Sequence, residues 1–270
     1  MPQRPHPVTR IPLRALLRVL VILAACTLAA CDAPPVQTGK QVSFDGASYR
    51  VVRINLSRER LSLHWLDPDT GKPFANIEAL RSWGARHGEQ LRFAANAGIY
   101  DRKGSPLGLY VEAGKVLKPL NTAHGDPAAG NFSMRPNGVF LVDHKGHARV
   151  MTTAAYRSHP PDPRLATQSG PMLVIDGAIN PHFLARSTSL KWRSGVCAPE
   201  PGQVVFAISE SPVNFHSFAR LFRDRLGCRD ALYLDGTISQ FFDHGDYFGP
   251  PVFMTKPYAG MFAVFDKAPQ

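Results

Sequence analysis

The stretch that decides the fold is residues 203–236, which read QVVFAISESPVNFHSFARLFRDRLGCRDALYLDG. It opens with the apolar run 204–208, which is typical of a buried strand. Asn214 can cap a helix in which apolar side chains then recur every three to four positions. A second apolar run, 231–234, predicts another buried strand that ends at Asp235-Gly236. The order strand, helix, strand predicts a helix packed on a mixed sheet.

Most of the chain outside this stretch alternates apolar and polar residues, which is the period of a strand with one buried face. Glycine-containing turns of the kind that hairpins need separate these runs. A second helix is predicted over residues 76–87, with Asn76 as its N-cap. The predicted fold class is therefore α+β, with a mixed, largely antiparallel β-sheet core and a few packed helices. The alternating segments are residues 49–57, 61–66, 108–116, 138–142 and 147–152.

The composition is that of one compact domain. Hydrophobic residues make up 44% of the 270 residues and charged residues only 19%, which excludes a disordered chain. No internal repeat or change in composition divides residues 41–270. This segment is therefore predicted to form a single domain.

The first thirty residues have the pattern of an export signal. Four arginines and no acidic residue accompany an uncharged apolar run, 19–30, which is shorter than the roughly 20 residues that span a bilayer. The run ends in Leu28-Ala29-Ala30-Cys31, which resembles the lipobox of bacterial lipoproteins. We therefore expect a signal peptide over 1–30, a lipidated Cys31 and a flexible tether over 31–40. The alternative is an ordinary secretory cleavage site with an incidental cysteine.

The resemblance to a lipobox implies a bacterial cell-membrane protein that is lipid-anchored and faces the periplasm. Removing the four signal arginines from the 31 basic residues leaves 27 against 21 acidic ones, a net charge of +6. This mild positive charge favours anionic ligands or an anionic membrane surface. It lacks the clustered basic stripe of a nucleic-acid-binding protein, so no nucleic-acid partner is expected.

The cysteines fit an oxidising compartment. Of the four, Cys26 lies in the signal and Cys31 would carry the lipid, so Cys197 and Cys228 remain as the candidate pair. A disulfide between them would stabilise the fold by roughly 3 to 4 kcal/mol, since it closes a long loop. The alternative is two buried free thiols.

Polar residues stand at the ends of several predicted strands, where a sheet would present them at one rim. Polar groups that close apolar strands need partners or a ligand, and the alternative for each is a turn or cap. Loops 243–246 and 124–126 carry Asp and His, but too few oxygen ligands for calcium, so neither a metal nor a cofactor is predicted. The strand-end residues are Asn96, Gln168, Ser169, Gly170, Arg193, Ser209, Glu210, Asp235 and Gly236.

Several motifs together resemble the phosphodiester glycosidase family. The resemblance covers roughly residues 41–266 and implies an enzyme that hydrolyses the bond between an anomeric sugar carbon and a phosphodiester oxygen. The chain departs from the family's enzymes at two places. It has Asn-Ala-Gly where they tend to have Asn-Gly-Gly, and Thr-Ile-Ser follows Asp235-Gly236 where they have a glycine-serine pair. The motifs are Asn96-Ala97-Gly98 with Gly108-Leu109, Gly130-Asn131-Phe132 with Pro136-Asn137-Gly138-Val139-Phe140, Ala166-Thr167-Gln168-Ser169-Gly170-Pro171, Arg193, and Ala231-Leu232-Tyr233-Leu234-Asp235-Gly236.

The chemistry of this reaction suggests a role for each candidate. A phosphoryl leaving group is already a stable anion, so a cationic clamp can replace most of the work of an acid. Arg193 is the expected clamp because a guanidinium binds phosphate oxygens in a bidentate fork. Its alternative is a structural ion pair with a carboxylate. Asp235 and Glu210 are the expected catalytic carboxylates, which would activate water or stabilise oxocarbenium character.

The remaining strand-end residues are expected to bind substrate by neutral hydrogen bonds or close backbone approach, all in one pocket with the catalytic residues. The expected function is an envelope-anchored hydrolase that cleaves a sugar phosphodiester or a related cell-envelope glycan such as an exopolysaccharide. The alternative is a non-catalytic periplasmic lipoprotein that binds an anionic glycan or a lipid headgroup. The expected substrate-binding residues are Asn96, Gln168, Ser169, Gly170, Ser209 and Gly236.

Overall fold

The computed structural model describes residues 1–2, 39–101, 103–123, 127–236, 238–251 and 256–267. Residues 38–270 form one compact unit. Cys31 and nearly all of the predicted signal peptide and tether lie outside the described residues. Within the described part of the chain, no helix has the length and apolar character needed to cross a membrane.

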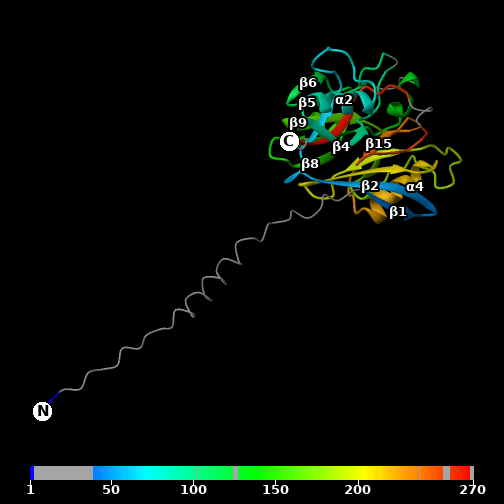
Figure 1. The fold of residues 1–270 in the computed structure, drawn as a ribbon. Coiled ribbons are helices and arrows are strands. Elements are labelled where there is room, and N and C mark those ends of the chain that lie inside the picture. Colours follow the sequence, from blue (N-terminus) through cyan, green and yellow to red (C-terminus); the bar gives the residue numbers. More distant parts are fainter. Residues whose placement is uncertain (3–38, 102, 124–126, 237, 252–255, 268–270) are drawn as a thin grey trace. The chain divides into compact units, whose positions relative to one another are not determined.

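Three antiparallel sheets make up the frame (Figure 1). The seven-stranded sheet has the order β1 (Lys40–Phe44), β2 (Ala47–Asn55), β13 (Gln203–Ser209), β12 (Ser194–Cys197), β14 (Ala231–Asp235), β10 (Met172–Ile175) and β11 (Ala178–Ile179). The β4 sheet has the order β16 (Asp246–Phe248), β15 (Phe241–Asp243), β4 (Glu89–Asn96), β17 (Met261–Lys267) and β3 (Leu61–His64). The β9 sheet has the order β6 (Lys115–Lys118), β5 (Tyr110–Glu112), β9 (Pro163–Ser169), β7 (Gly138–Asp143) and β8 (Ala148–Thr152).

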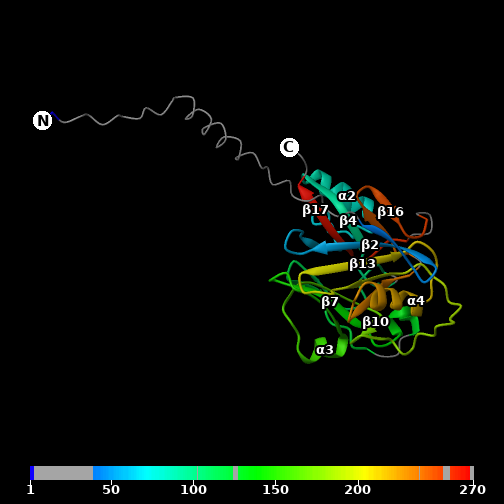
Figure 2. The ribbon, with the colours of Figure 1, turned by 90° about the horizontal axis from the view of Figure 1, so that it is seen from below.

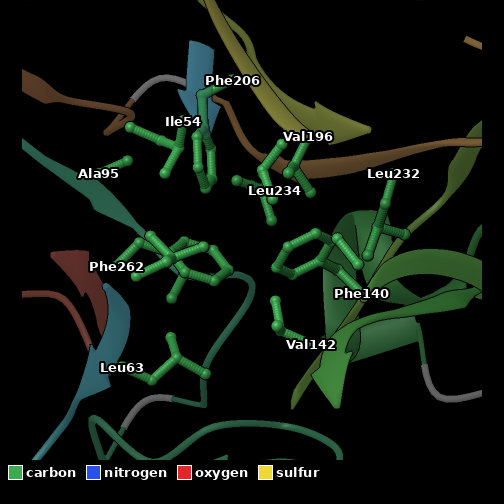
Figure 3. Packing of buried hydrophobic residues seen from close by; sticks show 14 of the residues in the cluster. Ile54, Leu63, Ala95, Phe140, Val142, Val196, Phe206, Leu232, Leu234 and Phe262 are labelled. Carbon is green, nitrogen blue, oxygen red and sulfur yellow. The ribbon is translucent and has the colours of Figure 1, made fainter. Parts of the chain in front are cut away.

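The three sheets bury their inner faces in one shared hydrophobic core (Figure 3). Phe206 of β13, Phe262 of β17 and Phe140 of β7 meet there, with ring centroids 5.0 to 6.3 Å apart. Because side chains alternate along a strand, the neighbouring residues of β7, Val139 and Leu141, pack on the opposite face. The continuous apolar character of these strands therefore reflects burial on both faces.

Helices cover the outer faces, as Figure 2 shows for α4 beside β10 and α2 beside β4. Helix α2 (Ile77–Arg86) packs on the β4 sheet, and α4 (Phe215–Arg220), continued by the π-helical turn η2 (Leu221–Arg225), packs on the seven-stranded sheet. The predicted caps are present, since Asn76 and Asn214 each accept a hydrogen bond of 2.8 Å from a backbone N–H in the first turn. The short helix α3 (Thr153–Ser158) packs against β7 and β8 of the β9 sheet, and the short helix η1 (Pro127–Ser133) precedes β7 in the chain.

The fold class predicted from the sequence needs one correction. All strand pairs of the described residues are antiparallel, so the sheets are not mixed and the fold is closer to a β-rich class with few helices. Strands β13 and β14 run in the same direction, as the strand, helix, strand order implied. The antiparallel strand β12 lies between them, so they do not pair.

The cysteine pair predicted from the sequence is joined. Cys197 of β12 and Cys228, just after η2, form a disulfide with a Cα to Cα distance of 6.1 Å. Both residues are buried in the cluster between α4 and the seven-stranded sheet. The bond therefore ties the end of the helix to β12, the strand that pairs with β14.

Candidate functional site

Asp235 is the last residue of β14 and lies partly exposed after four fully buried residues. Its carboxylate accepts a hydrogen bond of 2.6 Å from the N–H of Gly236. Burial nevertheless raises the pKa of Asp235 to about 7, and the Gly236 N–H opposes this shift. A carboxyl group with this pKa can both donate and accept a proton near neutral pH.

Two phenols lie close enough to Asp235 to be affected by its charge. Burial raises the pKa of Tyr100 and of Tyr233 well above the ordinary value, and the charge of Asp235 adds to the shift of each. The hydroxyl of Tyr233 accepts a hydrogen bond of 3.3 Å from Asn131 Nδ2. A Cβ on Gly236 would lie 2.6 Å from this hydroxyl, so only glycine permits the close approach. Both phenols therefore stay protonated as hydrogen-bond donors.

Arg193 is a buried cation beside Tyr233. Only 1% of the residue is exposed. Its Nε donates to the Val213 carbonyl at 2.8 Å, its Nη2 donates to the Ser189 carbonyl at 3.1 Å, and the guanidinium stacks on Phe215 at 3.6 Å. Burial lowers the pKa of Arg193. The electrostatic interaction and the hydrogen bond with Tyr233 raise this pKa, but they are smaller effects than burial.

The alternative of a structural ion pair finds no support at Arg193. Among the described residues it forms no ion pair with Asp235, Glu210 or any other carboxylate. A buried cation without an acidic partner is costly, so its position is maintained by the carbonyl groups and the aromatic ring. Because almost none of the side chain reaches the surface, Arg193 acts on the surroundings of Asp235 through its fixed charge and its contact with Tyr233, which is itself fully buried.

Asn96 and Ser169 adjoin the end of β14 from the other two sheets. Asn96 Oδ1 accepts hydrogen bonds from Ser194 Oγ (3.2 Å) and from the backbone N–H of Gln240 (3.3 Å), and Ser194 stands opposite Asp235 in the sheet. Asn96 Nδ2 is buried without a hydrogen-bond partner in the described part of the chain. Ser169 Oγ donates to the Leu234 carbonyl at 3.2 Å. The structure therefore brings these two residues together with Asp235.

Gln168 and Glu210 are not brought to this place. Gln168 points to the opposite face of β9 from Ser169, and its amide binds Leu109, Asn121 and Thr153. It anchors loops there and has no hydrogen-bonding atom directed at Asp235. Glu210 accepts a hydrogen bond of 2.8 Å from Gln41 of β1, which is on the far side of β13 from β14. Neither residue therefore belongs to the site around Asp235.

The remaining candidates are buried at the same end of the sheets. Ser209 Oγ accepts a hydrogen bond of 3.0 Å from the backbone N–H of Arg193 and so fixes the start of β12. Gly170 packs so closely against Asn137 Oδ1 that a Cβ would overlap this atom. Both therefore serve the local backbone geometry rather than offering free polar groups.

The loop 243–246, considered above as a source of metal ligands, is the hairpin between β15 and β16. Asp243 at its start is buried and pairs with Arg50 at 2.8 Å, because an unpaired carboxylate would not be stable there. His124, Gly125 and Asp126 lie outside the described residues.

Three residues of the site were not predicted as such. Tyr233 occupies a buried strand, where an aromatic side chain indicates core packing, and Tyr100 follows the motif that contains Asn96. Asn131 lies in the motif Gly130-Asn131-Phe132, and this was the one signal that could have pointed to it.

A model of the phosphodiester glycosidase family matches residues 89–259, most of the segment that contains these residues. The chain belongs to the phosphodiester glycosidase family. As a family member it is a phosphodiester glycosidase-like hydrolase. The chain is 36% identical over 213 residues to the uncharacterized protein YigE of Escherichia coli (strain K12), which covers 78% of this chain and 79% of that protein.

Two solved structures share the fold. The catalytic domain of zebrafish N-acetylglucosamine-1-phosphodiester alpha-N-acetylglucosaminidase, auto-inhibited by its pro-peptide, matches with a TM-score of 0.59 at 14% identity, over 86% of this chain and 84% of that one. A hypothetical protein from Synechocystis matches with a TM-score of 0.52 at 15% identity, over 87% of this chain and 64% of that one.

Proposed function

We propose that this family member is a membrane-anchored, periplasm-facing hydrolase that cleaves the glycosidic bond of a sugar phosphodiester or a related cell-envelope glycan. The observation that carries the proposal is the surroundings of Asp235. A carboxyl group with a pKa of about 7 stands within electrostatic reach of two protonated phenols, and a buried cation without an acidic partner lies beside one of them. Such perturbed groups cluster at catalytic sites.

Asp235 is proposed to be the proton-transferring group. In its ionised form it accepts a proton from the attacking water, and in its protonated form it donates one to the oxygen of the departing group. The group that departs from a sugar phosphodiester is a phosphate monoester, a stable anion that needs little help from an acid. The base role of Asp235 is therefore the more demanding one, which agrees with a pKa near neutrality.

The neighbours of Asp235 are proposed to stabilise the negative charge that develops on the phosphate. Tyr100, which is partly exposed, can donate its hydroxyl proton to the phosphate, whereas Tyr233 is fully buried and Arg193 beside it adds a fixed positive charge behind the site. Asn96 Nδ2, which is buried without a partner among the described residues, can donate to a sugar or phosphate oxygen. Arg193 is thus a positioning residue in this proposal.

The anchor and the compartment are proposed from the sequence alone. The arginine-rich start, the apolar run and the segment Leu28-Ala29-Ala30-Cys31 support them. The disulfide between Cys197 and Cys228 agrees with an oxidising compartment. A glycan of the cell envelope would be within reach of an enzyme held there.

The test is turnover of a panel of p-nitrophenyl sugar phosphodiesters and nucleotide sugars by the wild type and by Asp235→Asn. The amide keeps the shape of the side chain and cannot transfer the proton, so turnover should fall by about 100-fold or more. Asp246→Asn is the matched control because Asp246 is exposed on β16, and its turnover should stay unchanged. Saturable binding of the panel without turnover by the wild type would instead support a non-catalytic glycan-binding protein.

A further inference from the structure

The loop between β11 and β12, residues 180–193, carries two large apolar side chains that the core does not use. Leu184 is 72% exposed and Leu190 is 52% exposed, whereas the neighbouring Phe183 is buried. Figure 2 shows this loop, coloured between green and yellow, beside α4. Single exposed leucines are common on protein surfaces, but two in one loop form a local apolar patch whose burial would be favourable.

The backbone of this loop is fixed by the elements around it. Asn214, the N-cap of α4, donates from Nδ2 to two carbonyls of the loop, those of Ala185 (3.2 Å) and Ser187 (3.3 Å). The backbone of Lys191 exchanges hydrogen bonds of 2.8 and 3.1 Å with Val213. The two leucines are therefore held in water by an ordered backbone, so a partner that covers them need not order the loop first.

The loop is basic and contains no acidic residue. Its exposed positive side chains, Arg186 and Lys191, form no ion pair with any of the described residues. At the other end of α4, Asp45 and Asp224 are both paired with Arg220. Leucines among unpaired cations favour the surface of an anionic bilayer, whereas the core of a protein–protein interface is depleted of lysine.

The position of the predicted anchor agrees with a membrane surface at this loop. Residues 32–39 separate Cys31 from Lys40, the first residue of β1, and a chain of this length spans at most about 30 Å. The turn after β1 binds the end of α4, where Asp45 pairs with Arg220 at 3.1 Å, and the loop binds the N-cap of the same helix. A lipid on Cys31 would therefore hold the loop at a high effective concentration near the membrane.

We infer that the loop 180–193 is a membrane-contact surface, whose two leucines enter the headgroup region of a bilayer while its two basic side chains bind the phosphates of anionic lipids. This contact is additional to the predicted anchor and requires neither a lipid on Cys31 nor hydrolysis at Asp235. The loop ends beside the candidate site, since a Cβ on Gly236 would lie 3.7 Å from the carbonyl oxygen of Trp192. Contact through the loop therefore brings this end of the sheet to the membrane surface.

The experiment is sedimentation of the exported full chain carrying Cys31→Ala with lipid vesicles. The substitution removes the predicted lipid, and all further variants are made in this parent protein. Vesicles of phosphatidylcholine with about one third phosphatidylglycerol should sediment the protein, and this binding should weaken as salt is added. L184S/L190S should weaken it about tenfold or more because two apolar side chains no longer enter the bilayer. R186Q/K191Q should also weaken it and should reduce its dependence on salt.

Matched variants outside the loop test whether the loop itself makes the contact. Val116→Ser removes an apolar side chain that is 60% exposed on β6, and K145Q/R149Q removes two exposed charges from the hairpin of β7 and β8. Both should bind vesicles as the parent does. Asp235→Asn should bind equally well, which keeps this test separate from that of the proposed function.

Two results would overturn the inference. One is vesicle binding by L184S/L190S that equals that of the parent. The other is a parent that does not sediment with phosphatidylglycerol vesicles. If that parent instead self-associates in analytical ultracentrifugation and L184S/L190S does not, the leucines belong to a contact between two copies of the chain.

Discussion

Asp235 is held where water solvates its charge poorly, and this affects the stability of the fold. Its pKa in the folded protein, about 7, exceeds the ordinary 3.8, so the folded state binds this proton more tightly than the unfolded state does. The free energy of unfolding should therefore fall as the pH rises from about 4 to about 7 and remain lower above that range. The charge near the phenols is maintained at the expense of stability, as expected of a functional group.

The first prediction concerns Asp235→Asn, which removes the buried charge. At about pH 8 the variant should have a higher free energy of unfolding than the wild type, by up to about 4 kcal/mol, because three pKa units correspond to that energy. At about pH 4 the two proteins should be alike. Urea denaturation at both pH values measures the difference, and Asp246→Asn should follow the wild type. Equal stabilities at pH 8 would mean that burial does not raise this pKa.

Glu112 provides a second case of the same physics. Burial raises its pKa to about 7, opposed by a hydrogen bond from the Trp65 N–H. Some loss of stability between about pH 4 and 7 should therefore persist in Asp235→Asn and decrease further when Glu112→Gln is added. Urea denaturation of the single and double variants at both pH values distinguishes the two carboxyl groups.

Arg193 supports a second prediction at the scale of the residue. Arg193→Lys keeps the positive charge but loses the planar stack on Phe215 and the fork that binds two carbonyl groups. Turnover should fall about tenfold or more, while the midpoint of the pH profile stays near 7, because the pKa of Asp235 is raised by burial and not by Arg193. Arg220→Lys, at the partly exposed end of α4, is the control. Full activity of Arg193→Lys would remove Arg193 from the site.

At the scale of the element, local patterns predicted the helices better than the site. Asn76 and Asn214 were recognisable as caps because their side chains satisfy N–H groups of their own helices. The partners of Gln168 and Glu210 come from strands and loops distant in the sequence. A strand-end position alone therefore could not tell which side of the sheet each would face.

The turn after β4 carries the third prediction. Gly98 has a φ of +102°, and a Cβ there would lie 3.2 Å from Ser169 Cβ and Thr167 Oγ1. Gly98→Ala should therefore destabilise the protein by about 1 to 2 kcal/mol and also reduce turnover, because the motif containing Asn96 would shift. Gly46→Ala is the matched control. It imposes a similar backbone strain at φ +75° with nothing within 4 Å, so it should lower stability without affecting turnover.

The disulfide is the fourth prediction, also at this scale. The double variant C197A/C228A should lower the free energy of unfolding by roughly 3 to 4 kcal/mol, since it frees a loop of about 31 residues in the unfolded chain. Both positions are buried in one cluster, so part of the loss should come from packing. Denaturation of the wild type with and without reductant separates the two contributions. Stability that does not change on reduction would contradict the contribution of the disulfide.

At the scale of the whole molecule, the shared core of three sheets explains how residues far apart in the sequence meet. Asn96, Ser169 and Asp235 end strands in three different sheets that pack on the same aromatic residues. The sequence predicted the individual strands from their alternation. The closure of the sheets around one core depends on long-range pairing, such as β17 with β4, and no local pattern reports such pairing.

The last prediction concerns the whole chain in the cell. If Cys31 carries a lipid, Cys31→Ala should move the protein from the membrane fraction to the soluble periplasmic fraction, and the mass of the mature wild-type chain should exceed that of its polypeptide by an acyl modification. Cys26→Ala is the matched control, because Cys26 lies in the predicted signal peptide and should not affect fractionation. With ordinary secretory cleavage, the wild type would already be soluble and would carry no added mass. That result would remove the anchor from the proposed function and leave the chemistry at Asp235 untouched.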